Sequence, residues 1–163
     1  MIKNILITGG CGFIGSNLVN HLAEQGFKVF IIDVDGVMTS GHFFYSHQGK
    51  YLKCFGPDDN DGLSLLKPYI EVRFITGDKK GFNISKKRIV DDMNFKLDLV
   101  STVKRLDWIK KKFPLNRVIY MGDGILDYLV MNKVLYSVMF FLRGLIIRFL
   151  TSFHIFSESL SPC

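Results

Sequence analysis

The sequence has little of what marks a secreted or a zinc-binding protein. Its 163 residues include three cysteines, Cys11, Cys54 and Cys163, which lie far apart and have no Cys-x-x-Cys spacing. Neither a disulfide framework nor a zinc site is therefore expected, and a reducing cytoplasm is the expected location. The opening residues MIKNILITGG reach glycine too early for the apolar region of a signal peptide, so we expect none.

Long apolar runs and concentrated basic stretches are also scarce. The most apolar segment, residues 139–150 (MFFLRGLIIRFL), is interrupted by arginine and glycine and is too short to span a bilayer comfortably. The formal net charge is +6, but the lysines are dispersed or lie in helix-like stretches such as SKKRIV. A solvated helix face explains such stretches better than a nucleic-acid-binding stripe does. We therefore expect neither a membrane nor a nucleic acid as a partner.

Apolar strands alternate with helix-like segments along the chain, and this alternation predicts an α/β fold. The length suits one domain with a Rossmann-like parallel sheet flanked by helices. Residues 42–55 form two strand-like runs around a polar turn, which predicts a β-hairpin flap after the strand at 28–33. The other expected strands are 2–8, 71–78, 97–101 and 117–123, and the expected helices include 81–93 and 103–113.

The first motif is TGGCGFIG, with Gly9, Gly12 and Gly15 between a predicted strand and a predicted helix. This spacing lets the backbone approach a pyrophosphate, and Asp33 at the end of the next strand is placed to bond ribose hydroxyls. Residues 1–33 resemble the N-terminus of the NAD-dependent epimerases and dehydratases, which implies NAD as a cofactor. That family also uses a Tyr-x-x-x-Lys pair, which the sequence lacks. The glycines are therefore read either as a partial cofactor cradle or as a tight turn.

The second motif, DVDGVMT, places Asp33 and Asp35 two residues apart where a predicted strand ends. One carboxylate can attack phosphorus, while the other protonates the leaving oxygen and then activates water. A hard cation such as Mg²⁺ would offset the charge of these groups. The pair therefore suits phosphoryl transfer better than ribose binding alone.

Residues 28–138 resemble the haloacid dehalogenase-like hydrolases, whose further motifs follow in order. The resemblance implies that Asp33 is the nucleophile and that Asp35 is the acid and base. It also implies a phosphoryl clamp of Thr76 and Lys104, with Gly77 close by. The GDGILD segment matches the last motif, so the resemblance implies that Mg²⁺ is held by Asp33, by the backbone carbonyl of Asp35 and by Asp123, with Asp127 near the site.

Within that superfamily the sequence is similar to the capless phosphatases of 3-deoxy-manno-octulosonate 8-phosphate and related acidic sugars such as nonulosonate 9-phosphates. The resemblance implies a sugar phosphate substrate, and a homo-oligomer, typically a tetramer, in which the hairpin helps to close a neighbour's site. Two positions differ from that pattern: Asp78 and Asn60 stand where arginine is common. The substrate is thus less defined than the reaction.

We expect three segments: a partial dinucleotide-binding βα unit at 1–27, the hydrolase domain at 28–138 and an atypical apolar tail at 139–163. Because the strand at 28–33 cannot serve both sheets, we expect the hydrolase sheet to form and residues 1–27 to pack at its periphery. The alternatives to a phosphatase are an NAD-binding epimerase-like fragment and an inactive fusion or truncation product.

Overall fold

A five-stranded parallel sheet forms the centre of the protein, and the computed structural model describes residues 26–57 and 59–139. The strand order is β5-β4-β1-β6-β7. Strand β1 is central, because it pairs in parallel with β4 on one edge and with β6 on the other. This confirms the expected α/β fold with a Rossmann-like parallel sheet. The strands are β1 (Val29–Asp33), β4 (Glu71–Thr76), β5 (Lys96–Leu99), β6 (Val118–Gly122) and β7 (Tyr136–Met139).

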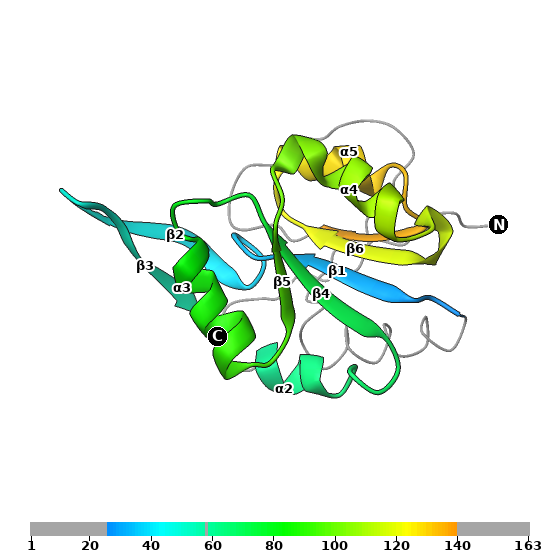
Figure 1. Cartoon of the computed structure of the whole chain (residues 1–163), viewed down its shortest axis with the longest axis horizontal. Coiled ribbons are helices and arrows are strands. Elements are labelled where there is room, and N and C mark those ends of the chain that lie inside the picture. Colours follow the sequence, from blue (N-terminus) through cyan, green and yellow to red (C-terminus); the bar gives the residue numbers. More distant parts are fainter. Residues whose placement is uncertain (1–25, 58, 140–163) are drawn as a thin grey trace, which may run out of the picture.

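The predicted β-hairpin flap is present and follows β1 directly. Strands β2 (Thr39–Ser46) and β3 (Gly49–Phe55) pair antiparallel in a separate two-stranded sheet. Gly49 closes the turn with a φ of 114°, a conformation that favours glycine. In Figure 1 the hairpin projects beyond the end of the parallel sheet, next to α3. The base of the hairpin thus lies at the edge of the sheet where β1 ends.

Helices cover both faces of the sheet. Helices α4 (Arg105–Lys112) and α5 (Tyr128–Met131) lie over one face, and α2 (Asp59–Ser64) lies on the opposite side (Figure 1). Helix α3 (Phe82–Lys86) continues directly into a π-helical segment, Lys87–Asp92. The sequence had predicted one helix over 81–93 and had not predicted α5 or β7. Strand β7 extends the sheet to Met139, the first residue of the predicted tail.

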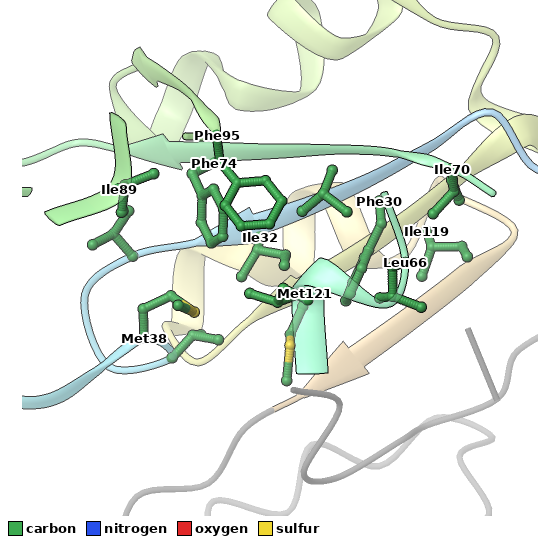
Figure 2. Close-up of a cluster of buried hydrophobic side chains, with 14 of the residues drawn as sticks. Phe30, Ile32, Met38, Leu66, Ile70, Phe74, Ile89, Phe95, Ile119 and Met121 are labelled. Atoms are coloured by element: carbon green, nitrogen blue, oxygen red, sulfur yellow. The ribbon is translucent and has the colours of Figure 1, made fainter. Parts of the chain in front are cut away.

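The core consists of two layers because residues along β1 alternate between the faces of the sheet. Phe30 and Ile32 pack with Phe74 on the face of the sheet that α2 covers. Figure 2 shows this cluster. Val29 and Ile31 pack in the other layer with Ile109 of α4. Asp33 continues the series of Val29 and Ile31. Its carboxylate is therefore directed to the face that α4 covers.

Several predicted features lie outside the described residues. These are the glycines of the first motif, the strand at 2–8 and almost all of the apolar tail. The three expected segments remain a prediction. Within the part of the chain that the structure describes, no helix combines the length and apolar character needed to cross a membrane.

The buried aromatic pair of the core gives a test of this packing. Phe74 is fully buried and contacts Phe95 edge to face, with 5.5 Å between the ring centroids. Phe74→Ala should lower the free energy of unfolding by about 3–5 kcal/mol, because it removes buried apolar surface and leaves a cavity. The matched control is Leu65→Ala at an exposed position, which should change it by no more than about 0.5 kcal/mol. Urea denaturation measures both, and similar losses would contradict the assigned core.

Candidate active site

Carboxylates gather where the two central strands end. Asp33 is the last residue of β1, Asp123 follows β6, and Asp127 ends the 3-10 turn Ile125–Asp127. One oxygen from each lies within 4.8 Å of the others. Asp127 is fully buried and Asp33 nearly so, whereas Asp123 is partly exposed. The cluster therefore opens to solvent on the side of Asp123.

Arg105 is the buried cation of this cluster. It begins α4, and its guanidinium binds both oxygens of Asp33, at 2.6 Å from Nη1 to Oδ2 and 3.0 Å from Nη2 to Oδ1. Nη1 also donates to Asp127 Oδ1 at 2.5 Å. Burial would lower the pKa of Arg105, but Tyr120, Asp33 and Asp127 outweigh it and raise that pKa. The guanidinium thus remains charged between two carboxylates.

Tyr120 and the backbone hold Asp127 in place. The Tyr120 hydroxyl donates to Asp127 Oδ1, and the Gly124 N–H donates to Oδ2 at 2.9 Å. Arg105 donates to the same hydroxyl at 3.1 Å. Because both oxygens of Asp127 have donors from the protein, its role here is to support Arg105 and the strand end.

Asp35 has different surroundings from Asp33, although the two are only two residues apart. Thr76, at the end of β4, donates from Oγ1 to Asp35 Oδ2 at 2.9 Å. Lys53 of β3 makes an ion pair with Oδ1 at 2.7 Å. Thr76 Oγ1 in turn accepts the Asp78 N–H at 3.0 Å. The two carboxylates of the DVD segment therefore face different partners.

The turn after β1 brings the backbone close to Asp123. Gly36 has a φ of 86°, and a β-carbon at this position would overlap the Asp123 carboxylate. The Thr39 hydroxyl accepts the Gly36 N–H at 3.1 Å and fixes the turn. Glycine is thus required both by the backbone conformation and by the close approach.

The acidic cluster has less positive charge around it than its carboxylates need. Burial raises the pKa of Asp33 to about 7, against the opposing effect of Arg105. Burial and the charge of Asp127 raise the pKa of Asp123 to about 6. A further cation beside these groups would favour their ionised forms.

The donor set at this position fits a hard divalent cation. Asp33 and Asp123 offer carboxylate oxygens, which Mg²⁺ prefers, on the open side of the cluster. Burial and neighbouring carboxylates raise the pKa of both groups, and a bound cation would act in the opposite direction. The side chain of Asp35 faces Thr76 and Lys53 instead. Metal binding by its backbone carbonyl stays a prediction.

Most of the predicted hydrolase residues come together, but Lys104 does not. Lys104 ends the 3-10 turn Thr102–Lys104 and is exposed, and the side chain that enters the cluster is that of Arg105. The start of α4 turns Arg105 inward, and the clamp role of Lys104 stays a prediction. Gly77 lies at the exposed end of β4, where a β-carbon would contact Thr102. Gly9, Gly12 and Gly15 lie outside the described residues.

Two buried cations were missed by the sequence analysis. Arg105 gave a signal, because it starts a helix-like stretch next to the predicted lysine and shares a face with Ile109, four residues later. Lys53 gave none, since the alternation of β3 does not show which element its side chain meets. Its ammonium nonetheless lies completely buried against Asp35.

Comparisons with known proteins match the two parts of the chain to different families. The 3-deoxy-D-manno-octulosonate 8-phosphate phosphatase KdsC of Salmonella typhi is 31% identical over 124 residues, which are 70% of this chain and 62% of that protein. The chain thus spans about three fifths of the length of the curated phosphatases it matches. The structure of a putative phosphatase of the same name from Vibrio cholerae has a TM-score of 0.56 at 28% identity, covering 72% of this chain and 66% of the other.

A further structure, the Moraxella catarrhalis 3-deoxy-D-manno-octulosonate 8-phosphate phosphatase, has a TM-score of 0.57 at 24% identity and covers 74% of this chain and 72% of that one. It shares the fold. The matches to the curated phosphatases, together with this shared fold, confirm the haloacid dehalogenase-like resemblance.

The N-terminal part matches a different family. Residues 5–44 match the NAD dependent epimerase/dehydratase family, slightly beyond the predicted limit at residue 33. A bifunctional UDP-glucose 4-epimerase and UDP-xylose 4-epimerase of Arabidopsis thaliana is 64% identical over 31 residues, which are 19% of this chain and 9% of that protein. Both expected resemblances are thus present, and the two overlap around β1.

The difference between Arg105 and Lys104 gives a test of the site geometry. In the presence of a chelator, Arg105→Met should lower the free energy of unfolding by about 3–5 kcal/mol, because it leaves the buried carboxylates of Asp33 and Asp127 without their cation. Lys104→Met, the adjacent exposed control, should change it by about 0.5 kcal/mol or less. Urea unfolding followed by circular dichroism measures both. A larger loss for Lys104→Met would show that the lysine, not the arginine, supports the cluster.

Proposed function

We propose that this chain is a magnesium-dependent phosphatase that hydrolyses a sugar phosphate through an aspartyl-phosphate on Asp33. The observation that carries the proposal is that two carboxylates two residues apart have different surroundings. Asp33 lies in the acidic cluster with Arg105, whereas Asp35 lies against Thr76 and Lys53. This difference supports attack on phosphorus by Asp33 and proton transfer by Asp35.

In the proposed reaction an oxygen of Asp33 attacks phosphorus as the bond to the sugar oxygen breaks. Asp35 gives its proton to that leaving oxygen. In the second step Asp35 takes a proton from water, whose oxygen attacks the phosphorus of the acyl phosphate and releases inorganic phosphate and Asp33. Thr76 and Arg105 supply a hydrogen bond and a fixed positive charge to the reacting groups.

Magnesium would be held by Asp33, Asp123 and the backbone carbonyl of Asp35, and when bound it would offset the negative charge of phosphate and carboxylates. The raised pKa values of Asp33 and Asp123 support this assignment, because such groups gain most from a cation. Arg105 gives Asp33 one donor per oxygen, and the Val34 N–H gives Oδ1 a second donor at 2.7 Å. The lone pair left for metal or phosphorus is therefore on Oδ2.

An acidic sugar phosphate is the proposed substrate class. The relatives in Salmonella and Vibrio are named for 3-deoxy-manno-octulosonate 8-phosphate, and the Moraxella structure is described as a complex with magnesium, phosphate and the sugar acid. A nonulosonate 9-phosphate remains a second member of this class. A homo-oligomer, as a tetramer, belongs to the same proposal and follows from the resemblance.

The epimerase-like alternative has weaker support from the described residues. A dinucleotide-binding unit would need the strand at 2–8 beside β1, but β4 and β6 occupy the two edges of β1. Asp33 would also have to bond a ribose, whereas both of its oxygens bind Arg105. NAD binding at Gly9, Gly12 and Gly15 stays a prediction. The other alternative, an inactive fusion or truncation product, is tested by the same experiment as the phosphatase.

The experiment is a measurement of phosphate release from a panel of sugar phosphates, including 3-deoxy-manno-octulosonate 8-phosphate, with and without Mg²⁺. We expect release that requires the metal and falls at least about 10²-fold in Asp123→Asn, because one metal ligand loses its charge. Asp107→Asn, an exposed aspartate of α4, is the matched control and should retain full activity. If folded wild-type protein released no phosphate from any ester, the proposal would be contradicted. The result would favour the alternative of an inactive fusion or truncation product.

A further inference from the structure

The hairpin places one buried lysine in the site. Lys53 lies on β3, and its side chain is completely buried. Its ammonium is 2.7 Å from Asp35 Oδ1, 2.9 Å from Asp78 Oδ2 and 2.9 Å from the Ser85 hydroxyl. The contact with Ser85 is a hydrogen bond, and the contacts with the two carboxylates are ion pairs. A buried charge with this full set of partners is held in one position.

Asp35 is held at both of its oxygens as a result. Thr76 donates to Oδ2 from the end of β4, and Lys53 binds Oδ1 from β3. The hydrogen bond and the ion pair come from different sheets, so the orientation of the carboxylate depends on the position of the hairpin. Asp33, by contrast, takes its fixed charge from α4 through Arg105. Each proposed catalytic carboxylate therefore has its own buried cation.

Asp78 anchors Lys53 from the other side. Its Oδ2 also binds Lys50 at 2.6 Å, and its Oδ1 accepts the Gly81 N–H at 3.0 Å. Burial acts to raise the pKa of Asp78, but the hydrogen bonds from Lys50 and Lys53 outweigh it and lower the pKa to about 2. Asp78 is thus an anion under all ordinary conditions. It stands where arginine is common in the similar phosphatases, so here the positive charge at this place comes from the hairpin.

We propose that Lys53 is a positioning residue that aims the Asp35 carboxyl group at the leaving oxygen, with Asp78 and Ser85 fixing the lysine. The inference rests on the proposed phosphatase function. When Asp35 gives its proton to the leaving oxygen as the phosphorus–oxygen bond breaks, it becomes a carboxylate, and the Lys53 ammonium stabilises that charge. Lys53 acts through Asp35 and does not touch the phosphate.

A purely structural lysine that only ties the hairpin to the sheet would behave differently. Loss of such a tie would slow every substrate equally. Loss of an aimed acid slows only those substrates whose leaving group needs a proton. Phenyl phosphate and p-nitrophenyl phosphate have similar shapes, but phenolate is the poorer leaving group, with a conjugate acid of pKa about 10 as in tyrosine. Comparing the two aryl phosphates therefore distinguishes a positioning lysine from a purely structural one.

The test compares kcat/KM for the two aryl phosphates in the presence of Mg²⁺, since this quantity reports the steps up to departure of the leaving group. For Lys53→Met we expect a fall of about 10²-fold with phenyl phosphate, the usual size of an acid contribution, and only a few-fold fall with p-nitrophenyl phosphate. Lys53→Arg should restore most of the loss because it keeps the charge. Lys50→Met is the matched control, because Lys50 binds Asp78 whereas the ion pair with Asp35 is made by Lys53. It should show a small, equal change on both esters.

Asp78→Asn is a second variant for the case that Lys53→Met does not fold. It keeps Lys53 and its pair with Asp35 but weakens the contact that fixes the lysine. It should show the same selective loss at a smaller size, a few-fold with phenyl phosphate alone. Equal losses on the two esters in either variant, with an active wild-type protein, would overturn the positioning role and leave the phosphatase intact. A folded wild-type protein inactive on both esters would overturn the proposed function, and the inference with it.

Discussion

Negative charge concentrated at one end of the sheet is the constraint on which the rest of the structure depends. The ends of β1 and β6 bring several carboxylates together, two of them almost completely buried. Burying unpaired carboxylates is costly, so cations must follow them into the interior. Arg105 enters from α4 and Lys53 enters from the hairpin. The placement of α4 and the hairpin over the strand ends is therefore linked to charge as well as to apolar packing.

The same constraint explains which residues of the site could be predicted from the sequence. Asp33, Asp35 and Thr76 follow apolar runs, and parallel strands end at one edge of a sheet, so their meeting could be predicted from the sequence. The identity of the cation could not. Consecutive residues of a helix point about 100° apart, so an uncertainty of one position at the start of α4 exchanges Lys104 for Arg105. The contact of Lys53 joins elements of two different sheets, which local patterns do not encode.

Strand β7 and helix α5 were missed for another reason. The run from residue 134 to 142 is apolar except for Ser137, so its composition does not separate β7 from the residues that follow. Periodicity cannot separate a short buried strand from a longer apolar segment. Residues 136–139 form a strand because they pair in parallel with β6, in a register that runs from Ile119–Tyr136 to Gly122–Met139. The sheet edge thus extends one residue into the predicted tail.

The account depends most directly on the covalent role of Asp33. The measurement that tests it is mass spectrometry of the Asp33 peptide after the protein has reacted with p-nitrophenyl phosphate and Mg²⁺, been quenched in acid and then been reduced with borohydride. Hydride reduces an acyl phosphate but not a free carboxylate, so the account predicts that residue 33 is recovered as homoserine while Asp35 and Asp123 are unchanged. An unmodified Asp33 under conditions in which phosphate is released, or reduction at another aspartate, would contradict it.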